Sequence, residues 1–235
     1  MATMAYQKLV FSGNFLEVYD YENGLLSGFK RKERDDVFEG KKQSLKRKAF
    51  SLTRTRRQLR RIVNSNPNLK KFLTLTFAQN ITDLDVAHYE FKKFLYRLKT
   101  HKKDMKYIAV VEFQKRGAVH YHILCNLHFM KTKHIEKLWK NGFVKINRID
   151  KCDNVGAYVC KYLQKDIMDT RLNGRKAFFT SRGIDRPIEV VDNFACKEIS
   201  KMYNLSKRIP EKQFSYENEH IGKVKYSIYN LKNNA

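Results

Sequence analysis

The sequence predicts an α+β protein built on a central antiparallel sheet of about five strands with flanking helices. First, short runs of β-forming residues and stretches with helical spacing follow one another in the order β-α-β-β-α-β-α. Second, residues 107–114 and 118–125 are two strand-like runs joined by three residues that end in Gly117, which is typical of a tight hairpin. Third, 42% of the 235 residues are hydrophobic and only 3 are Pro, so the chain can bury a core.

The N-terminal part combines an expected hairpin with an expected basic helix. Residues 7–22 alternate between apolar and polar side chains around Ser12-Gly13-Asn14, which predicts two paired strands. Residues 41–64 change to helical spacing, with Arg and Lys on one side and an apolar stripe on the other. The stripe consists of Leu45, Leu52, Leu59 and Ile62. Asn64-Ser65-Asn66-Pro67 is expected to end this helix.

The middle of the chain carries most of the expected sheet. A run rich in β-formers, FLTLTF, predicts a buried strand at 72–77. The other expected elements are a helix at 83–99, strands at 107–114 and 118–125, a short helix at 132–140 and a strand at 142–149.

The last third is expected to hold a helix from Asn154 to about Asp166, a helix near 192–203 and a hairpin within 214–229. We therefore divide the chain into three parts. Residues 1–66 form an N-terminal accessory segment, 67–190 the main domain and 191–235 a C-terminal accessory segment.

Charge is the strongest compositional signal. The chain has 48 Lys and Arg against 24 Asp and Glu, a formal net charge of +24, which predicts a polyanionic partner. Four cysteines without CxxC spacing disfavour a zinc ribbon and a disulfide framework, and predict reduced thiols. No leader and no membrane-length apolar run is evident, so we expect no membrane partner and a cytoplasmic location.

Two histidines and a glutamate are expected on one face of the 107–125 hairpin. His120 and His122 are two residues apart on a strand, so their side chains point the same way. If the turn pairs Gln114 with Ala118, Glu112 lies opposite His120, with Cβ atoms roughly 5 Å apart. Two imidazoles and a carboxylate can hold a divalent ion with open positions. An HxH pair alone is more often plain sheet surface, so this interpretation depends on Glu112 and on the helix that follows.

That helix carries a stripe of tyrosines and lysines. Spacings of three and four place Tyr158, Lys161, Tyr162 and Lys165 along one side. A tyrosine hydroxyl, with an ordinary pKa near 10, becomes a nucleophile at neutral pH beside a metal ion or a cation. Paired tyrosines at this spacing can also simply pack, although Val155, Val159 and Leu163 already supply an apolar stripe.

The segments KFLTLTF (71–77), AVHYHIL (118–124) and AYVCKYLQKD (157–166), in this order, resemble the three motifs of HUH endonucleases. The rolling-circle replication initiators of plasmids and filamentous phages, the gene II type, look most similar, and the resemblance extends over about 70–190. It implies an RRM/ferredoxin-like fold. It also implies that His120, His122 and Glu112 bind Mn²⁺ or Mg²⁺, and that Tyr158 and Tyr162 are nucleophiles assisted by Lys161 and Lys165.

The implied activity is nicking of single-stranded or hairpin origin DNA, which leaves a 5′-phosphotyrosine link and a 3′-hydroxyl primer. Because no Walker motif occurs, a host helicase and a host polymerase would be partners, and self-association stays open. The expected DNA-binding residues are Arg54, Arg56, Arg57, Arg60, Arg61, Lys115 and Arg116.

Two other functions are compatible with the pattern. A transposase or a mobilisation relaxase would share the metal and tyrosine chemistry. A non-catalytic RRM-like module would share the sheet but needs stacking aromatic residues on its face. Among the remaining histidines, His128 could share the sheet face if the strand continues past Asn126. The others, expected in solvent, are His88, His101, His134 and His220.

Overall fold

The computed structural model describes residues 3–27, 41–149, 154–163, 170–172, 174–218 and 221–232. The chain divides into two compact units. We call residues 40–185 the central unit and residues 1–39 together with 186–235 the terminal unit. Each contains one five-stranded antiparallel sheet, which confirms the α+β class but gives two sheets where the sequence predicted one.

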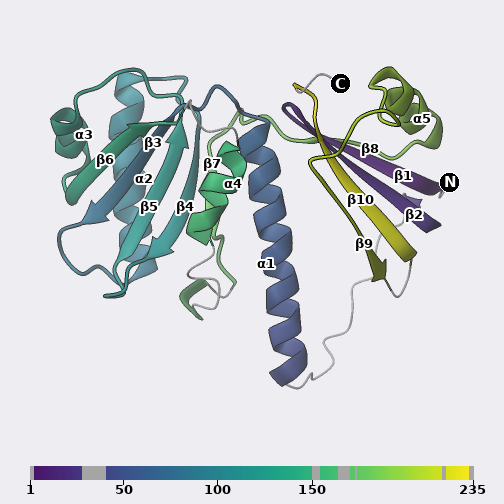
Figure 1. Ribbon diagram of the computed structural model, residues 1–235. Helices are drawn as coiled ribbons and strands as arrows, with labels where there is room; N and C mark the ends of the chain where they lie inside the picture. Colours follow the sequence, from purple (N-terminus) through teal and green to yellow (C-terminus); the bar gives the residue numbers. More distant parts are fainter. Residues whose placement is uncertain are drawn as a thin grey trace. The chain divides into compact units, whose positions relative to one another are not determined.

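The sheet of the central unit has the strand order β6-β3-β5-β4-β7, and all its pairs are antiparallel (Figure 1). Its strands are β3 (Lys71–Phe77), β4 (Tyr107–Phe113), β5 (Val119–Cys125), β6 (Gly142–Arg148) and β7 (Phe178–Thr180). The helices of this unit are α1 (Lys41–Asn64), α2 (Leu84–His101), α3 (Thr132–Trp139) and α4 (Val155–Cys160). Two 3₁₀ turns follow α4, at Lys161–Leu163 and Thr170–Leu172.

Two crossovers explain this strand order. The chain runs β3-α2-β4 with β5 lying between the two strands, and then β5-α3-β6 with β3 lying between. Such crossovers are nearly always right-handed, so both helices cover the same face of the sheet. The order of β6, β3, β5 and β4 is therefore the RRM/ferredoxin-like order that the sequence predicted, extended by β7 at one edge.

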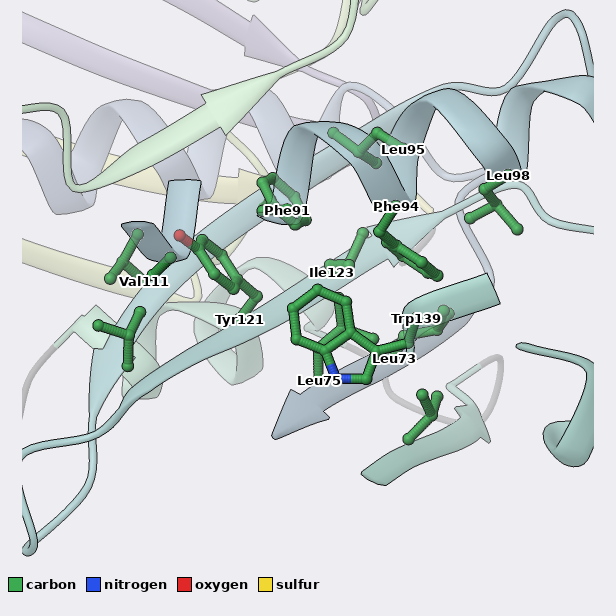
Figure 2. Close-up of a cluster of buried hydrophobic side chains, with 14 of the residues drawn as sticks. Leu73, Leu75, Phe91, Phe94, Leu95, Leu98, Val111, Tyr121, Ile123 and Trp139 are labelled. Atoms are coloured by element: carbon green, nitrogen blue, oxygen red, sulfur yellow. The ribbon is translucent and has the colours of Figure 1, made fainter. Parts of the chain in front are cut away.

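The face beneath α2 and α3 holds the larger core. Odd-numbered residues of β3 and β5 point into it, as expected from the two-residue period of a strand. Trp139 is fully buried there, and its indole Nε1 donates to the carbonyl of Thr76 at 3.1 Å. Figure 2 shows the packing of strand residues against both helices, including Leu73, Leu75, Val111, Tyr121, Ile123, Phe91, Phe94, Leu95, Leu98 and Trp139.

The opposite face is partly covered by α1 and α4. Leu59, Ile62 and Val63 of α1 and Val159 of α4 pack with even-numbered strand residues such as Phe72. The two helices approach closely at Gly156, where an added Cβ would lie 2.4 Å from Asn64 Oδ1 and 2.9 Å from the carbonyl oxygen of Arg60. Glycine is thus required for this helix contact.

The terminal unit joins the two ends of the described chain in one sheet, ordered β8-β1-β2-β10-β9. Its elements are β1 (Thr3–Ser12), β2 (Phe15–Ser27), β8 (Ile188–Val190), α5 (Asn193–Met202), β9 (Lys212–Asn218) and β10 (Gly222–Asn230). Tyr19 of β2 pairs with Tyr226 of β10. Cys196 of α5 packs with Leu9 and Leu16 on one face of this sheet.

The contacts group the chain differently from the three parts expected from the sequence. The basic helix α1 lies in the central unit, and the C-terminal segment shares its sheet with the N-terminal hairpin. The boundaries 1–66, 67–190 and 191–235 stay a prediction about the functional division of the chain. Cys125, Cys160 and Cys196 are buried free thiols, whereas Cys152 lies outside the described residues.

Among the described residues, no helix is both long enough and apolar enough to cross a membrane.

Candidate metal centre

The hairpin of β4 and β5 has the register expected from its turn. The amide of Gln114 donates to the carbonyl of Ala118 at 2.8 Å, and Gly117 has a φ of 87°, which an L side chain rarely adopts. As a result Glu112 pairs with His120, and His122 pairs with Val110 one step further along. The turn thus determines which side chains share the face.

Glu112, His120 and His122 offer ligand atoms that all lie within 4.8 Å of one another. We call them the Glu-His-His group. All three are buried, with exposures of 9%, 8% and 4%. His122 Nε2 is in hydrogen-bond contact with the Glu112 carboxylate. The group could hold a metal ion, as the sequence predicted.

The state of His120 fits a metal ligand. Its Nε2 is buried and has no hydrogen-bond partner within the described part of the chain. Burial and the neighbouring His122 lower the pKa of His120 to about 4, so its imidazole is neutral at pH 7. A buried polar atom without a partner is costly, and a neutral imidazole nitrogen is the form that binds divalent metals. The donor set therefore suits a cation.

His122 is oriented by β3. Its Nδ1 lies 3.1 Å from Thr74 Oγ1, and its ring stacks on Phe72 with centroids 5.7 Å apart. Hydrogen bonds to the second ring nitrogen commonly fix the orientation of a ligating histidine. Sequence reasoning missed Thr74 and Phe72. The alternation in FLTLTF carried a usable signal, because residues 72, 74 and 76 share the face of His120 and His122 through antiparallel pairing.

The tyrosines lie beside this group. Asn154 begins α4 by accepting a hydrogen bond from the Ala157 amide at 2.9 Å. Tyr158 and Tyr162 are half-buried, and the hydroxyl of Tyr162 donates to that of Tyr158 at 3.1 Å. The Tyr162 ring lies 3.8 Å from the His122 ring, measured between centroids.

Both tyrosines also pack on Phe72, at 5.3 Å between ring centroids in each case. Burial, the contact with Tyr158 and the charge of Glu112 raise the pKa of Tyr162 well above its ordinary value. Its phenol is therefore protonated at neutral pH unless a cation lies nearby.

The structure gives less support to the two lysines that were expected beside the tyrosines. Lys161 is exposed, and its Nζ lies 5.9 Å from the centroid of the Tyr158 ring. The α-helix ends at Cys160 and tightens into a 3₁₀ turn at Lys161–Leu163. The expectation that the α-helix continues to about Asp166 is therefore wrong for 161–163, whereas 164–166 lie outside the described residues. Lys165 lies outside the described residues.

The expected DNA-binding residues divide into two groups. On α1, Arg54 and Arg57 are exposed, whereas Arg56, Arg60 and Arg61 are half-buried. Lys115 and Arg116 are exposed in the β4–β5 turn. Arg116 also has a structural role, because it donates to the carbonyl of Phe77 at 2.8 Å and to Gln114 Oε1 at 2.9 Å.

The other histidines follow the expectations only in part. His101, His128 and His134 are exposed, and β5 ends at Cys125, so His128 does not extend the site face. His220 lies outside the described residues. The expectation for His88 is wrong: it is half-buried, its Nδ1 lies 2.5 Å from the Tyr121 hydroxyl, and burial lowers its pKa.

The described site thus combines an antiparallel sheet, a buried group of two histidines and one glutamate, and two tyrosines from a covering helix. This arrangement defines a candidate metal centre within a strongly basic unit. Residues 70–167 match the family of replication-associated proteins of the ORF2 and phage gene II type. This match confirms the resemblance to gene II-type initiators that the three sequence motifs indicated. No curated protein and no solved structure matches the chain.

Proposed function

We propose that this protein is a replication initiator that nicks single-stranded or hairpin origin DNA by tyrosine transesterification. The main support is the 3.8 Å separation between the rings of Tyr162 and His122, which brings a phenol next to the Glu-His-His group. The family match over 70–167 favours replication over the transposase and relaxase alternatives.

Glu112, His120 and His122 would hold the metal ion. A bound Mn²⁺ or Mg²⁺ ion polarises a phosphodiester and stabilises the charge that develops on its oxygens. The protein contributes a neutral His120, a His122 hydrogen-bonded to Thr74, and a position in which all three side chains are buried.

The reaction exchanges one phosphate ester for another. A tyrosine oxygen forms a bond to phosphorus, the bond from phosphorus to the 3′-oxygen breaks, and the phenolic proton is in net terms transferred to that oxygen. The products are a 5′-phosphotyrosine and a 3′-hydroxyl that can prime a polymerase. No water is consumed, so the ester is kept for later strand closure.

The contact between the two hydroxyls supports a role for both tyrosines. Tyr162 lies nearer the Glu-His-His group, and its hydroxyl oxygen lies 3.1 Å from that of Tyr158. Lys161 adds positive charge beside the Tyr158 ring. Lys165, four residues further along the sequence, is proposed to do the same for Tyr162. Which tyrosine attacks first is the question that single variants answer.

The basic residues are proposed to hold the DNA. The exposed guanidinium groups of Arg54 and Arg57 on α1 are accessible to phosphates, and the proposal extends to Arg56, Arg60, Arg61, Lys115 and Arg116. The protein would then work with a host helicase and a host DNA polymerase in the cytoplasm of a bacterial cell.

The test is a search for a covalent adduct. The protein is incubated with Mn²⁺ and 5′- or 3′-labelled single strands that tile the origin of its own replicon, and the products are separated on a denaturing gel. We expect a slow-migrating adduct with one label and a shortened free strand with the other. Tyr158→Phe or Tyr162→Phe should reduce the adduct, and the double variant should abolish it.

An adduct that persists in the double variant would exclude tyrosine chemistry at this site. Binding without any cleavage, with Mn²⁺ demonstrably bound, would favour a non-catalytic RRM-like module instead.

A further inference from the structure

The strand register aligns the Glu-His-His group with the outer strand β6. His120 pairs with Thr76 of β3, and Thr76 pairs with Phe143 of β6. In the next row, His122 pairs with Thr74, and Thr74 pairs with Lys145. Because directly paired residues point to the same face, Phe143 and Lys145 share the face of the two histidines.

The side chains on this face become more exposed from β5 through β3 to β6. The histidines are 8% and 4% exposed, Thr74 and Thr76 are half-buried, and Phe143 is 68% exposed. Lys145 is also exposed. The intervening residues Val144 and Ile146 point the other way and belong to the core beneath α2 and α3. The site face is therefore covered around β4 and β5 and accessible along β6.

We propose that Phe143 and Lys145 form a nucleotide-binding subsite for the strand that is cut. The Phe143 ring would stack on a base next to the scissile phosphate, and the Lys145 ammonium would pair with a neighbouring backbone phosphate. Strands lie about 4.8 Å apart, so the β6 side chains are about 10 Å from the histidines across the sheet. This inference rests on the proposed function, because the occupant is its single-stranded substrate.

Three features favour single-stranded DNA as the occupant. A large exposed aromatic ring on a sheet offers a stacking surface that accepts any base, since every base has a π face. The adjacent lysine supplies the charge that a backbone requires. The central unit also carries 34 Lys and Arg against 11 Asp and Glu, so a polyanion is attracted to it as a whole.

The test measures binding apart from cleavage. Fluorescein-labelled (dT)12 is titrated, with fluorescence anisotropy as the readout, into the full chain carrying Tyr158→Phe and Tyr162→Phe, with and without Phe143→Ala. Loss of one stacked base should weaken binding roughly 5- to 150-fold. Phe143→Trp should keep wild-type affinity, and Lys145→Ala should lower the salt slope by about 0.7.

Tyr96→Ala is the matched control. Tyr96 is 75% exposed on α2, which covers the opposite face of the sheet, so its loss should leave binding unchanged. The proposal is overturned if Phe143→Ala binds like its parent while retaining the same melting temperature, or if Tyr96→Ala weakens binding equally.

Cleavage gives the second readout, in the chain with both tyrosines intact. There Phe143→Ala should raise KM for the origin strand and leave kcat nearly unchanged. If the parent does not cleave at all, the proposed function fails while the anisotropy result still decides the subsite. If the parent cleaves and Phe143→Ala has no effect on binding or KM, only the subsite fails.

Discussion

The two units of this protein share an architecture and differ in charge. Each has a five-stranded antiparallel sheet. The central unit carries 34 Lys and Arg against 11 Asp and Glu, whereas the terminal unit carries 14 against 13. Nearly all of the net charge of +24 thus belongs to the unit that also holds the Glu-His-His group and the tyrosines. The attraction for a polyanion and the candidate chemistry coincide.

This difference shows that a sheet architecture alone assigns no role. The central sheet brings chemistry-bearing side chains to one face, and that face becomes accessible along β6. In the terminal sheet, the face packed by Cys196 and Leu9 holds an apolar cluster. Three experiments test this contrast between the two units.

The largest effect is expected from His122→Ala. Losing one of three proposed ligands would weaken metal binding and with it the charge stabilisation that a bound metal would supply, which is worth several kcal/mol. We expect nicking to fall by about a thousandfold or more, and Mn²⁺ binding measured by calorimetry to weaken in parallel. His101→Ala, an exposed histidine in the same unit, is the control. Unchanged Mn²⁺ binding in His122→Ala would remove this group as the metal centre.

A smaller effect is expected from Gly156→Ala, which tests whether α1 holds the tyrosine helix in place. The new methyl group would meet Asn64 Oδ1 at 2.4 Å and the Arg60 carbonyl at 2.9 Å. Overpacking of this kind costs about 1–3 kcal/mol, visible as a lower melting temperature together with a lower adduct yield. Ala157→Ser, on the exposed side of α4, should change neither. Full stability in Gly156→Ala would contradict the close helix contact.

The smallest effect is expected from removing surface charge, and it compares the units directly. Arg54→Ala with Arg57→Ala should lower the slope of log affinity against log salt by about 0.7–0.9 for each phosphate that the protein no longer neutralises. Lys223→Ala with Lys225→Ala removes two exposed charges from the terminal unit and should leave the slope unchanged. Equal decreases from the two pairs would mean that the terminal unit contacts DNA as well.

The sequence was most informative where structure is determined locally. The three residues between Gln114 and Ala118 determine the register of β4 and β5, so the pairing of Glu112 with His120 followed from turn length and strand period alone. The proximity of Tyr158 and Tyr162 could likewise be predicted locally, because residues four apart lie on the same side of a helix. The accessible side of the site could not be predicted in this way, because β6 pairs with β3, which lies 65 residues or more earlier in the chain at every paired position.

Features that depend on distant contacts escaped sequence reasoning. β7 and β8 have three residues each, too few for a periodic signal. Both terminal hairpins were expected, but nothing local indicates that β2 pairs with β10. The burial of His88 depends on Tyr121, which reaches it from a strand 33 positions away. The helical spacing also gave no signal for the change from α-helix to 3₁₀ turn after Cys160.

In the sequence, the central unit lies between the two segments that form the terminal unit, and this order has a consequence for biosynthesis. Tyr19 of β2 meets its partner Tyr226 only after about 200 further residues have been translated, which takes roughly 10–40 s at about 5–20 residues per second. An isolated two-stranded hairpin is marginally stable in water. The basic unit can therefore complete its own sheet on the ribosome while the β1–β2 hairpin still lacks β8 and β10, its neighbours in the sheet. During synthesis the terminal unit is thus the part most exposed to chaperones and proteases.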